Sequence, residues 1–153
     1  MFTFLIITFL VPIVDQFIKF GVRMNIAENS QVETFLPFLA LTNVKNFGAA
    51  LGIFSKGRWI LVAITLFIMM YFIYLIFIKK NRNRLFLIAS SLIIGGGIGN
   101  LIDRFMWGYV IDYISLSFFP PVCNFADYSI TMGIALLFLF VLKADNKTLS
   151  NFI

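Results

Sequence analysis

Four carboxylates lie in or beside apolar segments that are long enough to cross a bilayer. Asp15 interrupts the first such segment, Asp103 ends the third, Asp112 follows it and Asp127 begins the fourth. The chain has only seven acidic residues in 153, and ionisable groups in membrane segments are rare and usually functional. Two carboxylates held close together cannot both ionise, so one can activate a water molecule while its protonated partner donates to a leaving amine.

Asp112 is the carboxylate that is hardest to explain as part of a local ion pair. It follows Gly108 in "GYVIDY", and no basic residue lies within seven positions of it. Asp127 is fifteen residues further on, across a turn that Pro120 and Pro121 predict. We therefore interpret Asp112 and Asp127 as a pair whose pKa values are driven apart.

Two of the other polar groups also have structural explanations. Asp15 and Lys19 are four residues apart, so they could form a helical ion pair that reaches toward the membrane surface. Asn100, Asp103 and Arg104 share one helix face, and Arg104 could simply neutralise Asp103.

The residues before and at Asp127 have a structural explanation of their own. Asn124 three residues before Asp127 is typical of a helix N-cap with an acid in the first turn, where the helix dipole stabilises negative charge. Both the cap and the catalytic interpretation of Asp127 stay open at this point.

Composition identifies the class of protein. The chain is 61% hydrophobic and 12% charged, against roughly 45–50% and 25% in soluble domains, so it is an integral membrane protein. It has no histidine, which excludes Ser-His-Asp and Cys-His nucleophiles and histidine-ligated zinc. The single Cys123 excludes an internal disulfide and a multi-cysteine metal site. Catalysis would have to use carboxylates, Lys, Arg, Tyr or a bound ion.

Four apolar segments are near the roughly 20 residues that a spanning helix needs, at about 2–20, 59–78, 85–101 and 125–142 of one domain, 1–153. The basic run "KKNRNR" at 79–84 predicts that the loop between spans two and three is cytoplasmic, and Lys143 and Lys147 place the C-terminus there too. With an even number of spans, both termini are cytoplasmic. The net charge of +5 is therefore a topology signal and does not indicate nucleic-acid binding.

The orientation leaves two segments outside, 21–58 and 103–124, and gathers the acids at one depth. Asp15 lies about 21 Å along the first span, in the outer leaflet, level with the other three carboxylates.

The longer outer segment alternates in a way that predicts short strands on the membrane surface, with one side formed by Phe38, Ala40, Thr42 and Val44. After them come four small residues that would allow another backbone to approach, or equally a tight helix-packing patch, namely Gly48, Ala49, Ala50 and Gly52.

The chain resembles the lipoprotein signal peptidases (signal peptidase II), membrane aspartyl endopeptidases of bacteria. The resemblance covers nearly the whole length, in four blocks that occur in the family's order: "DQFIK" from Asp15, "NFGAALGIF" from Asn46, "GNLIDRFMWGYVIDY" from Gly99 and "NFADYSI" from Asn124. The family usually has Thr or Ser where this chain has Ile18, and Phe where it has Cys123. The stretch between Asp112 and Asp127 is also shorter than is usual there.

The resemblance implies four transmembrane helices with a small extracytoplasmic β-sheet cradle, in an otherwise all-α protein of the bacterial cytoplasmic membrane. It implies cleavage of diacylglyceryl-modified prolipoproteins on the amino side of the lipidated cysteine, at the outer leaflet. The catalytic aspartates would be Asp112 and Asp127. The supporting residues would be Asp15, Asn46, Asn100, Arg104 and Asn124, with Asp103 structural.

We expect no cofactor, no metal and no nucleic acid, and a monomer in contact with membrane lipid. A small exporter is the main rival, but transport sites usually lie near the midplane. A non-catalytic assembly factor is a second rival, which would need no carboxylate pair. A Ser-Lys peptidase would have to use Ser90 or Ser91, which lie mid-span with no lysine in their helix.

Overall fold

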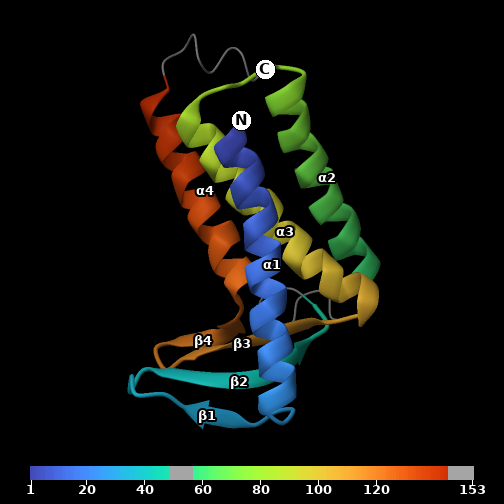
Figure 1. Ribbon diagram of the computed structural model, residues 1–153, viewed down its shortest axis with the longest axis vertical. Coiled ribbons are helices and arrows are strands. Elements are labelled where there is room, and N and C mark those ends of the chain that lie inside the picture. Colours follow the sequence, from blue (N-terminus) through green and yellow to red (C-terminus); the bar gives the residue numbers. More distant parts are fainter. Residues whose placement is uncertain (49–56, 145–153) are drawn as a thin grey trace.

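Four long helices meet a small β-sheet at one end of the molecule in the computed structural model, which describes residues 1–48 and 57–144 (Figure 1). The helices are α1 (Phe2–Asn25), α2 (Arg58–Phe77), α3 (Arg84–Met106) and α4 (Phe125–Lys143). The strands are β1 (Gln31–Glu33), β2 (Leu39–Asn46), β3 (Val110–Leu116) and β4 (Phe119–Cys123). Within the described residues, these four helices are long and apolar enough to cross a membrane.

The helices correspond to the four predicted spans, but two of them continue further. We placed the ends of the first and third spans at residues 20 and 101, whereas α1 ends at Asn25 and α3 at Met106. Asp103 therefore lies inside α3 and is fully buried. The helix can continue through this polar stretch because its charged side chains find partners inside the protein, as described below.

Helix α3 is the centre of the bundle. Its most apolar stretch is 72% buried, compared with 33% for α1 and 22% each for α2 and α4. Glycines of α3 allow α1 and α4 to pack closely against it. A Cβ on Gly96 would lie 2.5 Å from the carbonyl oxygen of Ala126 in α4, and one on Gly99 would lie 2.7 Å from Asp15 Oδ2 in α1. The second contact brings a carboxylate of α1 directly against the α3 backbone.

The sheet is antiparallel with the strand order β1-β2-β3-β4. The strand predicted from the alternating residues is β2, in which Ala40 and Thr42 are buried, whereas Phe38 precedes the strand and is exposed. The alternation then breaks, because Leu41 is opposite Ile114 but Val44 is opposite Asp112. This bulge shifts the register so that the last residues of β2 run beside Asp112.

The predicted turn at Pro120 and Pro121 is wrong. Both prolines lie within β4, and the tight turn of the β3–β4 hairpin is at Ser117 and Phe118. Strand β4 is at the edge of the sheet, and its pairing with β3 is irregular between Ile114 and Leu116. Proline is tolerated at sheet edges and at bulges, where the ladder does not use the missing N–H.

The sheet and the basic loop lie at opposite ends of the bundle. The N-terminus, the connection from α2 to α3 and the end of α4 share the end away from the sheet (Figure 1). The predicted orientation requires this arrangement. Of the four small residues after β2, Gly48 is buried, and Ala49, Ala50 and Gly52 lie outside the described residues.

Candidate active site

Asp112 and Asp127 line the same cavity, of about 660 Å³, between the sheet and helices α2 to α4. Three more of the predicted site residues line it as well, namely Asn46, Asn100 and Arg104. The sixth and seventh, Asn124 and Asp15, are fully buried behind the cavity wall. All seven therefore gather at the sheet end of the bundle.

Asp112 is held by two side-chain amides. Asn46 Nδ2 donates to Asp112 Oδ2 at 2.8 Å, and Asn124 Nδ2 donates to Asp112 Oδ1 at 2.6 Å. Only 2% of Asp112 is exposed. Burial, and next the negative charge of Asp127, raise the pKa of Asp112 to about 7, although the two amides act in the opposite direction. This carboxyl can therefore both hold and release a proton near neutral pH.

Asp127 is part of a capping box at the start of α4. Asn124 Oδ1 accepts from the Asp127 N–H at 2.9 Å, and Asp127 Oδ2 accepts from the Asn124 N–H at 3.1 Å. The helix-cap interpretation is confirmed, and Asp127 also lines the cavity. The other oxygen, Asp127 Oδ1, accepts from Asn100 Nδ2 at 2.8 Å.

Two asparagines connect the carboxyl groups to each other. Asn124 Nδ2 also donates to Asn100 Oδ1 at 3.2 Å, so a continuous chain of hydrogen bonds runs from Asp112 through Asn124 and Asn100 to Asp127. The chain fixes which way each amide points, because each asparagine oxygen already accepts and each nitrogen donates. The two carboxyls are thus held as one unit.

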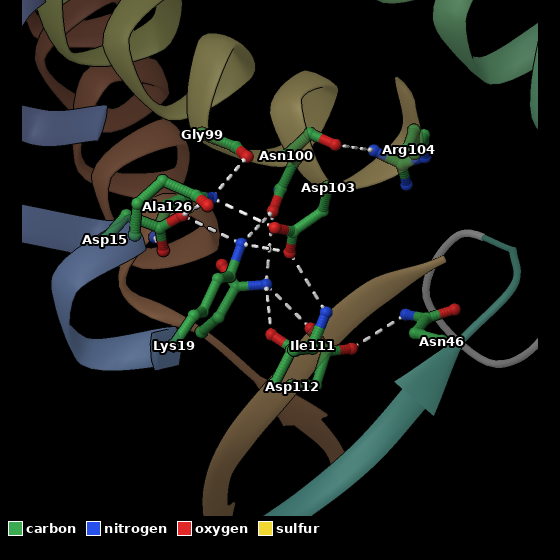
Figure 2. Close-up of polar contacts among 12 residues, drawn as sticks. Asp15, Lys19, Asn46, Gly99, Asn100, Asp103, Arg104, Ile111, Asp112 and Ala126 are labelled. Atoms are coloured by element: carbon green, nitrogen blue, oxygen red, sulfur yellow. Dashed lines mark hydrogen bonds and ion pairs between the residues drawn. The ribbon is translucent and has the colours of Figure 1, made fainter. Parts of the chain in front are cut away.

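Behind this unit lies an ion cluster in which Lys19 contacts two aspartates. Lys19 Nζ is 2.8 Å from Asp15 Oδ2 and 2.9 Å from Asp103 Oδ2, and all three side chains are fully buried (Figure 2). The predicted Asp15–Lys19 pair is confirmed, but it points into the protein and does not reach toward the surface. The alternative in which Arg104 neutralises Asp103 is wrong, because Lys19 takes that place.

Arg104 instead points toward Gly48, which follows the end of β2. Its Nη2 donates to the carbonyl oxygen of Gly48 at 3.1 Å, and among the described residues it forms no ion pair within 4.0 Å. Its guanidinium is therefore a cation in the cavity wall that keeps donors for a bound molecule.

The remaining wall of the cavity is mostly apolar. Thr65 of α2 and Ile130 of α4 line it on the helix side, and Val122 and Cys123 line it on the sheet side. Burial, and next the charges of Asp127 and Asp112, raise the pKa of Cys123 to about 11, so its thiol is neutral. In the described part of the chain, no three His, Cys, Asp or Glu side chains are grouped so as to hold a metal ion.

Two polar residues near the site were not predicted to have these contacts. Lys19 donates to Asn100 Oδ1 at 3.1 Å as well as to the two aspartates, and Gln16 Nε2 donates to Asp103 Oδ1 at 3.0 Å. One signal could have pointed to them: Gln16 and Lys19 follow Asp15 by one and four residues in an apolar helix, where isolated polar residues usually face a protein interior.

Comparison with known proteins places the chain in a family. The sequence model of the family described as Signal peptidase (SPase) II matches residues 7–143. The chain belongs to the signal peptidase II family. It is therefore a protease, a hydrolase that spans the membrane several times.

Relatives of the signal peptidase II family match over nearly their whole length. A lipoprotein signal peptidase of Symbiobacterium thermophilum is 32% identical over 94% of this chain and 96% of its own. One from Halothermothrix orenii is 35% identical over 92% and 95%, and one from Streptococcus agalactiae is 36% identical over 93% of both.

Solved structures of bacterial membrane enzymes have the same fold. One, determined at 2.3 Å by the in meso method, has a TM-score of 0.87 and 32% identity, and the match covers 94% of this chain and 89% of that one. A second, at 1.9 Å, has a TM-score of 0.85 and 32% identity, with 95% and 96% covered.

Proposed function

We propose that this chain removes the signal peptide from diacylglyceryl-modified prolipoproteins, by cutting on the amino side of the lipidated cysteine with Asp112 and Asp127. The names of its relatives support the substrate class. The observation that carries the chemistry is the pair of buried carboxyls that line one cavity and are joined by Asn100 and Asn124.

In this mechanism a water molecule lies between the two carboxyls, which share one proton. The ionised carboxylate takes a proton from the water, whose oxygen attacks the scissile carbonyl carbon. The protonated partner then donates to the leaving nitrogen, the C–N bond breaks, and the pair again holds one proton. A pKa of about 7 at Asp112 suits this exchange, and the two roles belong to the coupled pair.

The neighbouring groups have supporting roles in the proposal. Asn46, Asn100 and Asn124 orient the carboxyls, because each donates to at least one of them. Arg104, whose donors have no carboxylate partner among the residues that the structure describes, binds a carbonyl of the peptide or the lipid head. Hydrolysis by this route uses only water and the protein's own acids, so it calls for no cofactor.

The proposal also assigns the position of the protein in the bacterial cytoplasmic membrane. Both termini and the basic run at residues 79–84 face the cytoplasm, and the sheet forms a cradle at the outer leaflet. The acyl chains of the substrate then stay in the bilayer while the peptide bond enters the cavity. The protein acts as a monomer, since all proposed site residues come from one chain.

The test is cleavage of a synthetic precursor peptide by the purified protein in detergent, followed by mass spectrometry. We expect a single cut before the lipid-modified cysteine, and much slower cleavage of the same peptide without lipid, because the head-group linkage supplies recognition. Equal cleavage of both peptides contradicts the lipid part of the proposal. No cleavage of either contradicts the proposal as a whole.

A further inference from the structure

Two further aspartates hold the backbone next to the two proposed catalytic residues. Asp103 Oδ2 accepts from the N–H of Ile111 at 3.1 Å, and Ile111 directly precedes Asp112 (Figure 2). Asp15 Oδ1 accepts from the N–H of Ala126 at 3.0 Å. Ala126 in turn directly precedes Asp127. Each member of the catalytic pair thus has a buried carboxylate fastened to the residue before it.

Lys19 connects these two anchors. Its ammonium donates to Asp15 Oδ2 at 2.8 Å, to Asp103 Oδ2 at 2.9 Å and to Asn100 Oδ1 at 3.1 Å. Three acceptors use the three N–H groups of an ammonium, and Lys19 is fully buried. Its third contact also orients Asn100, whose Nδ2 then faces Asp127.

We infer that Lys19 is a positioning residue that sets the separation of the Asp112 and Asp127 carboxyls, an inference that rests on the proposed function. No residue of α1 lines the cavity among those the structure describes. Helix α1 reaches the elements that carry the pair through the polar contacts of Asp15 and Lys19, and through Val22, which packs in one apolar cluster with Ile111 and Tyr113. We call the contacts of Lys19 with Asp15 and Asp103 the bridge. The bridge links α1 and α3 to the backbone of β3 and of α4, the two elements that carry the pair.

The separation of the pair matters because both carboxyls must reach one water molecule. A misplacement of about 1 Å can slow an enzymatic reaction by roughly 100-fold even when the substrate still binds. Loss of the bridge should therefore lower kcat and leave KM nearly unchanged. A residue that only stabilises the fold would lower the amount of folded enzyme and leave kcat per folded molecule as it was.

The variants must remove the contacts of Lys19 without changing the net charge of the cluster. Lys19→Met alone leaves two buried carboxylates without their cation and can prevent folding. The double variant Lys19→Met with Asp15→Asn removes one positive and one negative charge, so the formal charge of the cluster is unchanged. Asn at position 15 can still accept from the N–H of Ala126, and Asp103 keeps Gln16 and Ile111 as donors. Lys19→Met with Asp103→Asn is the reciprocal pair.

The experiment measures kcat and KM on the lipidated precursor, per folded molecule, for both double variants. The matched control is Ser90→Ala, which removes another buried hydrogen bond of the bundle, from Ser90 Oγ to the carbonyl of Phe86 at 2.7 Å. We expect kcat to fall by about 10- to 100-fold in each double variant, with KM within about threefold. The control should keep both constants.

Three outcomes overturn the inference. The first is a double variant that folds and keeps native kcat. The second is a loss of activity that matches the loss of folded protein. The third is failure of both double variants to fold, which makes the cluster a requirement for the fold as a whole. Asp112→Asn, measured alongside, separates the two proposals: if it stays active the proposed function fails, whatever the Lys19 variants do.

Discussion

Asn124 donates its side-chain amide to Asp112 Oδ1 at 2.6 Å while it caps the helix that carries Asp127. Its Oδ1 accepts from the Asp127 N–H, and its own N–H donates to Asp127 Oδ2. One fully buried side chain therefore starts α4 and holds both carboxyls. The helix cap and the carboxyl pair are two consequences of the same residue.

Variants of Asn124 should separate the cap from the site. Asn124→Ser keeps an oxygen that can cap α4 but loses the amide donor to Asp112, so we expect near-native thermal stability with cleavage at least about 10-fold slower. Asn124→Ala loses both functions and should also lose about 1 kcal/mol of stability. Thermal unfolding and kcat of both variants check this. Native cleavage by Asn124→Ser would mean that the amide contact is dispensable.

The raised pKa of Asp112 predicts how stability changes with pH. The folded protein keeps this proton up to about pH 7, whereas the unfolded chain releases it near 3.8. Below about pH 4, Asp112 is protonated in both states and does not change the free energy of unfolding. Between about pH 4 and 7 that free energy falls as pH rises, and above about pH 7 Asp112 causes no further fall. Asp112→Asn cannot ionise, so its melting temperature should rise relative to that of the native protein over this interval. Parallel curves across the interval would contradict the assignment.

The cleavage rate should also depend on the proton that Asp112 loses near pH 7. The pair needs one proton to give to the leaving nitrogen, so kcat should decline as pH rises past about 7. The measurement is kcat against pH at saturating substrate, with unfolding followed in parallel. A rate that stays constant well above pH 7 in folded enzyme is incompatible with a proton held at Asp112.

Replacement of Asp103 should destabilise the protein. Asp103 contacts Lys19 at 2.9 Å and the N–H of Ile111 at 3.1 Å, and all of it is buried. Lys19 keeps Asp15 as its partner, so the loss is that of a charge-assisted contact, about 1.5–3 kcal/mol, and Asp103→Asn should unfold at a lower temperature. The control is Glu28→Gln, which breaks the exposed Glu28–Lys45 pair and should leave the melting temperature unchanged. Equal effects of the two variants would refute a distinct role for the buried cluster.

The orientation can be tested with reporters at two sites. A reporter fused at Asn81, in the basic loop between α2 and α3, should be cytoplasmic. One inserted at Asn29, between α1 and β1, should be external, because it lies at the sheet end of the bundle (Figure 1). The reverse pattern would put the carboxyl pair on the cytoplasmic side, where the proposed substrate is not presented.

Apolar length and the placement of acids predicted much of this fold. Segments of about 20 apolar residues have few ways to satisfy their backbone in a bilayer except as helices, so all four spans were predicted. The shared depth of Asp15, Asp103, Asp112 and Asp127 followed from the direction of each span. The proposal of Asp112 and Asp127 as the catalytic pair came from the lack of a basic partner for Asp112 and from the family resemblance.

The contacts between helices could not be predicted in the same way. Whether Asp103 meets Arg104 or Lys19 depends on how α3 is rotated against α1, and spacing along one helix favours the local partner. The turn predicted at Pro120 and Pro121 was wrong for a related reason. An edge strand tolerates both prolines, and only the strand order shows that β4 is at the edge. The bulge that brings the end of β2 beside Asp112 also has no signal in the alternation of residues.

The most direct test of the account is the cleavage rate of Asp112→Asn, Asp127→Asn and the double variant on the lipidated precursor. Asparagine is nearly the same shape as aspartate but cannot take up and return a proton. Each single variant should therefore fold, insert and show no cleavage. The double variant should be no worse than either, because residues that act as one unit are not additive. If Asp127→Asn keeps full turnover, Asp127 is only a helix cap and the two-aspartate mechanism is wrong.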